Sequence, residues 1–242
     1  MYVYGVVRAD AEPRLPDTGI DGRPVGRLAE GEVAAVVGDA AEGPVRASRR
    51  NLMAHSRVLQ SVLETPCDVL PMRFGVVMPD AAALRDELLV AHTAELAAQL
   101  DVVSGKVELD VTVSCPEESI LRAVVAGNRQ LADAARQAAG HQQRIAAGEA
   151  IAAGVADYRE AVAARALEEL GPFATDAVAE EPHTDEELLR AAFLVERGRV
   201  EGFDAALERL GAALGDEARV RSVGPVPPYH FVDLALQERA WA

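Results

Sequence analysis

The sequence predicts an α+β protein of two domains, and three observations favour this fold class. Short runs rich in valine and aromatic residues alternate with longer runs in which apolar residues recur every three or four positions. Glycine and proline separate these runs from one another. A chain of 242 residues, of which 50% are hydrophobic, is also long enough to bury two small cores.

Three strands are expected to open the first domain, which we place at residues 1–104. Residues 2–7 (YVYGVV) are a β-rich run, and a loop that contains three prolines follows. Residues 25–39 (VGRLAEGEVAAVVGD) have the pattern of a hairpin that turns near Glu30 and Gly31.

Two helices and a further strand complete the predicted β-β-β-α-β-α order of this domain. A helix is expected from about residue 48 to residue 64, because apolar side chains recur on one of its faces. That face contains Leu52, His55, Leu59 and Val62. Asp80 is the predicted N-cap of the second helix. Its apolar stripe contains Leu84, Leu88, Leu96 and Leu100, with His92 in the same register.

The strand expected between these helices, VLPMRFGVVMPD at residues 69–80, contains an arginine. A two-residue period assigns one face to the core. That face contains Leu70, Met72, Phe74, Val76 and Met78. Arg73 lies on the other face, and one interpretation is a buried or half-buried arginine paired with an acid such as Glu64 or Glu87. The other is an arginine beneath a partner-binding surface, where Gly75 leaves room for close approach.

The second domain, residues 105–226, is predicted to open with a strand and a long helical region. Apolar and polar residues alternate over residues 106–115, as in a half-buried strand. Pro116 and the acids after it are typical of a helix start. The helix is expected to break at Gly127 and then to continue through an alanine-rich stretch to Gly171.

Two strands are expected next, at residues 173–179 and 189–195. A competing signal exists, because Thr184 and Glu187 have the spacing of a capping box, which would make the second run a helix. We favour a strand there, since it completes a regular order of elements.

A helix at residues 200–214 and a strand at residues 218–224 complete this domain. Apolar residues recur at helical spacing in the first, and Gly215 ends it. The resulting β-α-β-β-α-β order is that of a ferredoxin-like domain, here with a long helical insertion. Residues 227–242 are expected to form a tail that packs back on the body.

Charge and cysteine content disfavour several classes of partner. The formal charge of −15 would repel nucleic acids and anionic membranes. Cys67 and Cys115 are isolated, so we expect reduced thiols and neither a disulfide nor a zinc site. No signal peptide and no run of about 18 apolar residues is recognisable, so we expect a cytoplasmic protein that does not cross a membrane.

The sequence contains no arrangement typical of catalysis or of cofactor binding. None of the five histidines has a carboxylate, serine or cysteine at the spacing of a known motif, and we interpret His55 and His92 as hydrogen-bonded core residues. The glycines form neither phosphate-binding pattern, GxGxxG or GxxxxGK[ST]. Carboxylate pairs such as Glu117-Glu118 are typical of solvated helix ends. We expect no catalytic residue, no metal and no cofactor.

Four segments occur in an order and spacing similar to those of the gas vesicle protein F/L family. They are MYVYGVV at residues 1–7, HSRVLQSVLETPCDVLPMRFGVVMPD at residues 55–80, AAFLVERGRVEGFDAALERL at residues 191–210 and GPVPPYHFV at residues 224–232. LPMRFG and GPVPPYHFV carry most of the specificity, and the resemblance extends over nearly the whole chain. The motifs do not separate F members from L members.

The resemblance implies a non-enzymatic accessory protein of gas vesicle formation, associated with gas vesicles in the cytoplasm. Such proteins are regarded as assembly factors or minor components that contact the small hydrophobic shell protein and other accessory proteins. The residues implied in partner binding, or in the fold of the motifs, are Arg73, Phe74, Gly75, Pro225, Pro228 and Tyr229. An alternative is a ferredoxin-like module that binds a small regulatory molecule. A hydrolase that uses His55 or His92 is the third hypothesis.

Overall fold

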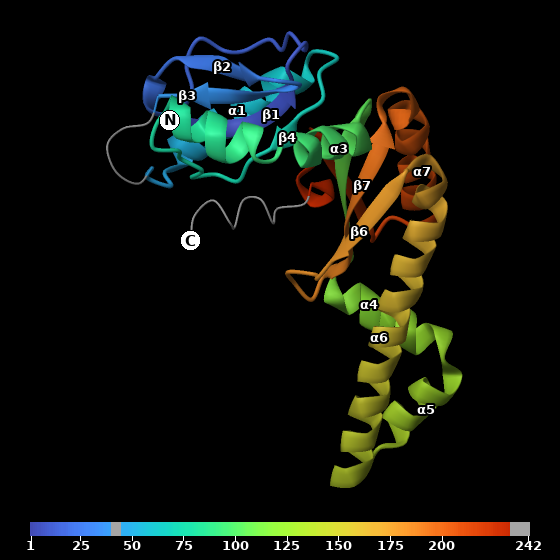
Figure 1. The fold of residues 1–242 in the computed structure, drawn as a ribbon. Helices are drawn as coiled ribbons and strands as arrows, with labels where there is room; N and C mark the ends of the chain where they lie inside the picture. The colour runs from blue at the N-terminus through green and yellow to red at the C-terminus, as the bar shows by residue number, and fades with distance from the viewer. Residues whose placement is uncertain (40–44, 233–242) are drawn as a thin grey trace. The chain divides into compact units, whose positions relative to one another are not determined.

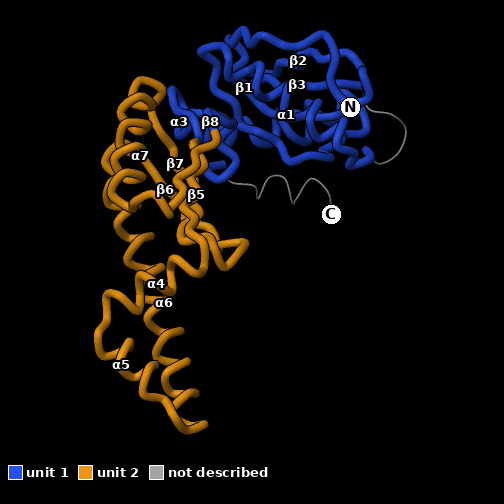
Figure 2. Tube along the Cα trace, turned by 180° about the vertical axis from the view of Figure 1, so that it is seen from behind, with its two compact units in different colours: residues 1–108, 224–242 blue, residues 109–223 orange. Residues whose placement is uncertain are grey.

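The computed structural model describes residues 1–39 and 45–232, and the chain forms two compact units (Figures 1 and 2). Unit 1 contains residues 1–108 and the segment that begins at Gly224, and unit 2 contains residues 109–223. Helices and two four-stranded sheets make up the fold, so the predicted α+β class is confirmed. None of the described helices is both long and apolar enough to span a lipid bilayer.

The sheet of unit 1 has the strand order β2-β3-β1-β4. Its strands are β1 (Tyr2–Arg8), β2 (Val25–Glu30), β3 (Val33–Gly38) and β4 (Leu70–Pro71). β1 pairs antiparallel with β3 on one side and with β4 on the other. Since β1 has a strand on each side, its backbone is fully enclosed, and every residue from Tyr2 to Val7 is buried.

Helix α1 (Arg49–Leu63) has the predicted extent. Ser48 caps it, because its hydroxyl accepts a hydrogen bond of 3.2 Å from the backbone N–H of Asn51. A single turn of 3-10 helix, η1 (Ile20–Gly22), lies against α1. Asn51 also joins the two, since its amide donates to the carboxylate of Asp21 at 3.1 Å.

The second predicted helix of unit 1 is interrupted. It consists of α2 (Ala81–Ala83), the π-helical segment η2 (Leu84–Val90) and α3 (Thr93–Val103). The predicted N-cap is confirmed, because the carboxylate of Asp80 accepts a hydrogen bond from the N–H of Ala83 at 2.8 Å. His92 lies at the start of α3 and is half-exposed. Its assignment to the core was wrong, because the break between η2 and α3 takes it out of the register of the leucines.

Two apolar cores pack against this sheet, one on each face, as the alternation of side chains along a strand requires. The core that includes α1 contains Tyr2, Tyr4, Val58, Leu59 and Val62. The core that includes η2 and α3 contains Val3, Val6, Leu84, Leu89, Leu96 and Leu100. Leu52 belongs to neither, since 44% of its side chain area is exposed, so its predicted place on the buried face of α1 was wrong.

The second sheet has the strand order β6-β7-β5-β8. Its strands are β5 (Lys106–Ser114), β6 (Asp176–Glu180), β7 (Glu187–Glu196) and β8 (Arg219–Val226). β6 and β7 pair antiparallel. The strand prediction for residues 189–195 is therefore confirmed, and the capping-box helix was wrong, because alternate residues of β7 enter the core as Phe193 does.

The helices of unit 2 agree with the predicted order. They are α4 (Glu117–Gly127), α5 (Arg129–Gln137), α6 (His141–Leu170) and α7 (Val200–Leu214). Short 3-10 turns, η3 (Gly171–Phe173) and η4 (Arg197–Arg199), follow α6 and β7. The predicted break is confirmed at Asn128, whose side chain caps α5. Figure 1 shows α5 and the first half of α6 extending beyond the sheet.

Gly5 lies in close contact with the segment of β4. A Cβ atom there would lie 2.7 Å from the carbonyl oxygen of Leu70 and 2.9 Å from Cγ2 of Val69. We expect Gly5→Ala to lower the free energy of unfolding by about 1–3 kcal/mol, because the backbone of β4 must move. Urea unfolding measures this change.

Gly26 in β2 provides the matched control, since a Cβ atom there meets nothing within 4 Å. Gly26→Ala should change the free energy of unfolding by less than about 0.5 kcal/mol. Equal losses of stability in the two variants would contradict the close approach of β1 and β4.

Candidate functional site

His55 lies on the buried face of α1 and hydrogen-bonds to three distant segments of the chain. Its Nδ1 atom is 2.8 Å from the hydroxyl oxygen of Tyr2 in β1. Its Nε2 atom is 3.1 Å from the carbonyl oxygen of Met72 and 3.2 Å from the hydroxyl oxygen of Tyr229. The side chain is only 3% exposed, and the prediction of a hydrogen-bonded core histidine is confirmed.

These contacts define the tautomer of His55. A carbonyl oxygen only accepts hydrogen bonds, so Nε2 must carry the hydrogen that it donates to Met72. Nδ1 of the neutral ring is then an acceptor, and the hydroxyl of Tyr2 donates to it. The hydroxyl oxygen of Tyr2 in turn accepts the backbone N–H of Gly75 at 3.1 Å. Both ring nitrogens are therefore used by the fold.

Three further aromatic contacts enclose the imidazole. The ring of Tyr4 stacks on it at 5.6 Å between centroids, and the ring of Phe74 meets it edge-on at 5.9 Å. Tyr2 also presents its ring edge-on, at 5.7 Å. We call Tyr2, Tyr4, His55, Phe74 and Tyr229 the His55 cluster. It joins residues from the N-terminal strand, from α1, from the LPMRFG motif and from the PPYHFV segment.

Burial sets the ionisation of this cluster. Removal from water lowers the pKa of His55 to about 4, although its hydrogen bond to the carbonyl of Met72 acts in the opposite direction. Burial also raises the pKa of Tyr2 and of Tyr229 above the ordinary value for a phenol. At neutral pH the cluster therefore holds no charge, and its hydroxyls keep the protons that they donate.

The LPMRFG motif contains a bulge rather than a continuous strand. The N–H of Met72 donates to the carbonyl of Tyr4 in β1. The neighbouring residue of β1, Val3, bonds four residues further along the motif, since its N–H donates to the carbonyl of Val76. The residues between Met72 and Val76, namely Arg73, Phe74 and Gly75, are therefore extra and loop out of the pairing with β1. Gly75 has a φ of +100°, which a residue with a side chain adopts only under strain.

The bulge corrects two predictions. Phe74 does not join the core that contains Met72 and Val76 but packs, half-buried, on the α1 side of the sheet. Arg73 is exposed, so a buried or half-buried arginine was wrong. The two-residue period failed at Phe74 because the three inserted residues loop out of the pairing and do not follow the alternation of the strand. Gly75, at the end of the insertion, was the only signal of the bulge in the sequence. A Cβ atom on Gly75 would meet nothing within 4 Å, so its backbone conformation is what requires glycine.

The segment from Gly224 to Val232 is held to the rest of unit 1 at several points. Next to its start, the side-chain amide of Gln60 in α1 donates to the carbonyl of Pro225 at 3.3 Å. A 3-10 turn, η5 (Tyr229–Phe231), then carries the tyrosine that contacts His55, and Val232 enters the apolar core. Pro225 itself is exposed, Pro228 is buried, and Tyr229 is half-buried. Residues 233–242 of the predicted tail lie outside the described part of the chain.

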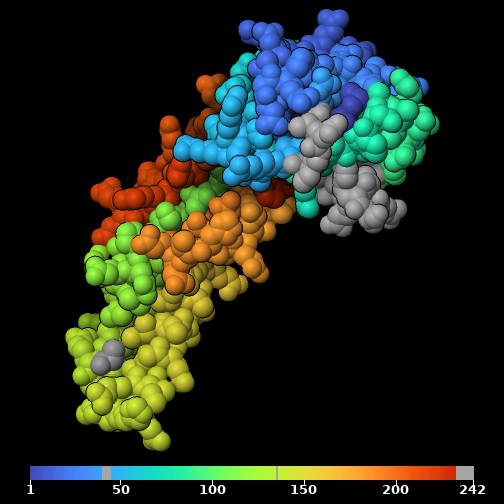
Figure 3. Space-filling model, turned by 90° about the vertical axis from the view of Figure 1, so that its left-hand side faces the viewer, coloured from blue at the N-terminus to red at the C-terminus, as the bar shows by residue number. Residues whose placement is uncertain are grey.

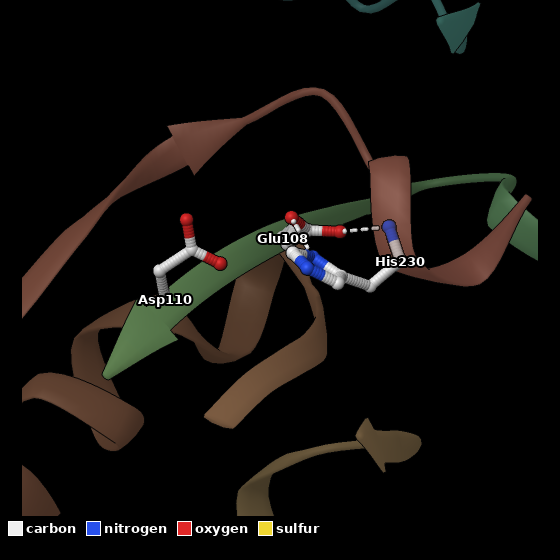
Figure 4. A group of neighbouring side chains, drawn as sticks. All are labelled: Glu108, Asp110 and His230. Atoms are coloured by element: carbon white, nitrogen blue, oxygen red, sulfur yellow. Dashed lines mark hydrogen bonds and ion pairs between the residues drawn. The ribbon is translucent and has the colours of Figure 1, made fainter. Parts of the chain in front are cut away.

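His230 and Glu108 form a second attachment of this segment (Figure 4). The backbone N–H of His230 donates to Oε2 of Glu108 at 2.9 Å, and its Nδ1 atom lies 2.8 Å from Oε1. Glu108 is 1% exposed, so this contact satisfies a buried carboxyl group. The sequence gives no signal of the pair beyond the polar position of Glu108 in an alternating strand.

The buried, neutral state of His55 makes acid stability a test of the cluster. In the unfolded chain its pKa is near 6.5, and in the native protein it is about 4, so the unfolded state binds more protons between these values. Stability that is present above about pH 6.5 should be lost progressively as the pH falls through about 4, by about 3 kcal/mol in total.

His55→Gln removes this titration and keeps a polar side chain. We expect the variant to be less stable at pH 7 and to lose less stability than the native sequence between pH 7 and pH 4, as measured by urea unfolding across that range. All other titrating groups are common to both proteins. Identical pH profiles for the two would contradict a neutral, buried His55.

Comparison with known proteins identifies the family. The family described as gas vesicle synthesis protein GvpL/GvpF matches residues 1–233. Gas vesicle protein F of Streptomyces sp. (strain CB03234) is 38% identical over 241 residues, which cover 96% of this chain and 99% of that protein. Gas vesicle protein F of Dolichospermum flosaquae is 27% identical, with 97% and 98% covered.

Solved structures agree in fold. The crystal structure of the gas vesicle protein GvpF from Anabaena sp. PCC7120 covers 95% of this chain and 96% of its own, with a TM-score of 0.87 at 24% identity. That of GvpF from Microcystis aeruginosa gives a TM-score of 0.77 at 26% identity, with 95% and 97% covered. The match to the family extends over the motifs that meet at His55, and the chain belongs to the gas vesicle synthesis protein GvpL/GvpF family.

Proposed function

We propose that this protein is a non-enzymatic accessory protein of gas vesicle formation, which acts in the cytoplasm by binding the small hydrophobic shell protein and other accessory proteins. Membership of the GvpL/GvpF family supplies the gas vesicle context. A shell subunit with an apolar surface tends to aggregate unless a soluble partner covers it. A chain with a formal charge of −15 is suited to keep such a complex in solution.

The observation that carries the proposal is the exposed bulge of the LPMRFG motif. Arg73 is exposed at its start, while the next two residues are tied to the core through Phe74, which packs on His55, and Gly75, which bonds to Tyr2. Because the backbone next to Arg73 is fixed in this way, binding has to order only its side chain, which favours an anchor residue. Pro225, exposed in the second motif, is a further candidate contact.

The surroundings of His55 support a non-enzymatic role. Its hydrogen-bond partners are two tyrosine hydroxyls and a backbone carbonyl, which position a ring rather than activate a nucleophile. Its lowered pKa keeps it neutral at the pH of the cytoplasm. His55 is also only 3% exposed, so a substrate could not reach its ring. The fold uses this histidine as a structural link.

We propose in addition that unit 2 is a ferredoxin-like domain. The elements β5, α4, β6, β7, α7 and β8 follow one another in β-α-β-β-α-β order. The spatial order β6-β7-β5-β8 supports this assignment. The first and third strands in chain order, β5 and β7, are neighbours at the centre of the sheet, and the second and fourth, β6 and β8, are its edges. In this description α5 and α6 are the long helical insertion.

Replacement of Arg73 tests the binding function. We expect Arg73→Ala to reduce capture of the protein by immobilised shell protein about tenfold, since truncation of an anchoring arginine typically costs one or more kcal/mol. In a gas-vesicle-forming host from which the gene has been deleted, the variant should restore fewer vesicles than the native sequence does, as counted by electron microscopy.

Arg209→Ala is the matched control, because Arg209 is an exposed arginine on α7 and the change in net charge is the same. Both variants should unfold at the temperature of the native protein. Normal vesicles in the deletion strain would refute a role in gas vesicle formation. Equal capture of native protein and Arg73→Ala would refute Arg73 as the anchor.

A further inference from the structure

Two large apolar residues of α1 are exposed in part to solvent. Leu52 and Met53 are adjacent in sequence, and 44% and 57% of their side chains are exposed. His55, Leu59 and Val62 of the same helix are buried. Leu52 lies two turns from Leu59 and so borders that buried face, whereas Met53 lies on the outer side of the helix. One face of α1 thus builds the His55 cluster and the core, and the other presents Met53 among polar and charged side chains.

A groove of about 760 Å³ has Met53 in its lining. One wall is the loop that contains Arg14, Leu15 and Pro16, and the other is the face of α1 that contains Met53 and Arg57. Ser56, Gln60 and Ser61 add hydroxyl and amide groups to the helical wall. We call this the α1 groove, and Figure 3 shows the light-blue residues near position 50 at the surface beside the darker blue N-terminal ones.

Basic residues are concentrated on α1 and just before it, beside a groove whose lining contains two arginines and two acids. Four arginines and no acidic residue occur between Glu42 and Glu64. They are Arg46, Arg49, Arg50 and Arg57, and all are exposed. Arg14 adds a further guanidinium on the loop wall. In a protein with a formal charge of −15, a helix without carboxylates concentrates positive potential at one place.

The two arginines that line the groove are available for binding. The side chains of Arg14 and Arg57 form no ion pair with any residue in the ranges 1–39 and 45–232. Two acids, Asp17 and Glu64, lie in the lining of the groove, and neither is paired with an arginine there. The surface therefore combines an apolar strip, hydrogen-bonding groups and available cations.

We propose that the α1 groove binds an acidic amphipathic segment of another protein. Its apolar side chains would cover Leu15 and Met53, and its carboxylates would meet Arg14 and Arg57 as charge-assisted hydrogen bonds. α1 has 15 residues and is about 22 Å long, which suits a partner helix of about four turns. The proposal goes beyond shell-protein binding, because it concerns another surface and a partner of different chemistry.

A short acidic segment is favoured over a nucleic acid or a lipid surface. A polyphosphate or an anionic bilayer extends over the acidic remainder of the chain and is repelled by it. A short segment can place its carboxylates at Arg14 and Arg57 and near the exposed Arg49 of α1, away from the two acids of the lining. The apolar residues Leu15 and Met53 of the lining also suit a side-chain surface better than a phosphate backbone.

A synthetic peptide tests the proposal with the full-length protein. The probe is a fluorescein-labelled 14-residue amphipathic helix with leucines on one face and glutamates on the other. We expect saturable binding at micromolar protein in fluorescence anisotropy, weakened by added salt. Arg57→Glu should weaken binding about tenfold or more, and Met53→Ser should weaken it without changing the salt dependence.

Two controls make the result decisive. The same peptide with lysine in place of each glutamate should not bind, and Arg209→Glu, which makes the same charge change on α7, should bind the acidic peptide as the native protein does. No saturable binding up to about 1 mM peptide, or equal loss in Arg57→Glu and Arg209→Glu, would overturn the proposal.

Other occupants of the groove would give different results. Tighter binding of single-stranded DNA or of phosphatidylserine vesicles, lost in Arg57→Glu, would overturn the acidic segment in favour of a polyanion. Self-association in analytical ultracentrifugation that Arg57→Glu abolishes would assign the groove to a second copy of this chain. Because the probe is synthetic and the readout excludes the shell protein, failure here leaves the proposed function standing.

Discussion

The hydrogen bonds of one neutral imidazole link α1 to three distant segments of unit 1. His55 accepts from Tyr2 of the central strand and donates towards Met72, and the hydroxyl of Tyr229 lies within reach of the same nitrogen. These partners are 53, 17 and 174 residues away along the chain. A charged ring would lose the acceptor at Nδ1, so the arrangement requires burial deep enough to keep the ring neutral.

Helix α1, which carries His55, links the His55 cluster to the proposed binding surfaces. Its buried face fixes the bulge that exposes Arg73, through the packing of Phe74 and the hydrogen bond from Gly75 to Tyr2. Its outer face lines the α1 groove. The two proposed binding surfaces are therefore both supported by α1, one through its buried face and one through its outer face.

Periodicity predicted the order of helices and strands because it reports local burial, and the ends at Ser48, Asp80 and Gly215 follow from local capping chemistry. It failed at Phe74, because a bulge depends on how two segments pair, which a single segment does not encode. The pair of Glu108 and His230, 122 residues apart, was missed for the same reason. The family motifs marked the right segments without indicating that they meet at one histidine.

The ionisation and tautomer of His55 test most directly whether this ring links the segments of unit 1. Two-bond ¹H–¹⁵N correlation spectra of the labelled protein report both, through the shifts of the ring nitrogens. The structure predicts that Nε2 carries the hydrogen at pH 7 and that the ring stays neutral until the pH approaches about 4. A ring protonated on Nδ1, or one that titrates near pH 6.5, would contradict the link between β1, the bulge and the C-terminal segment.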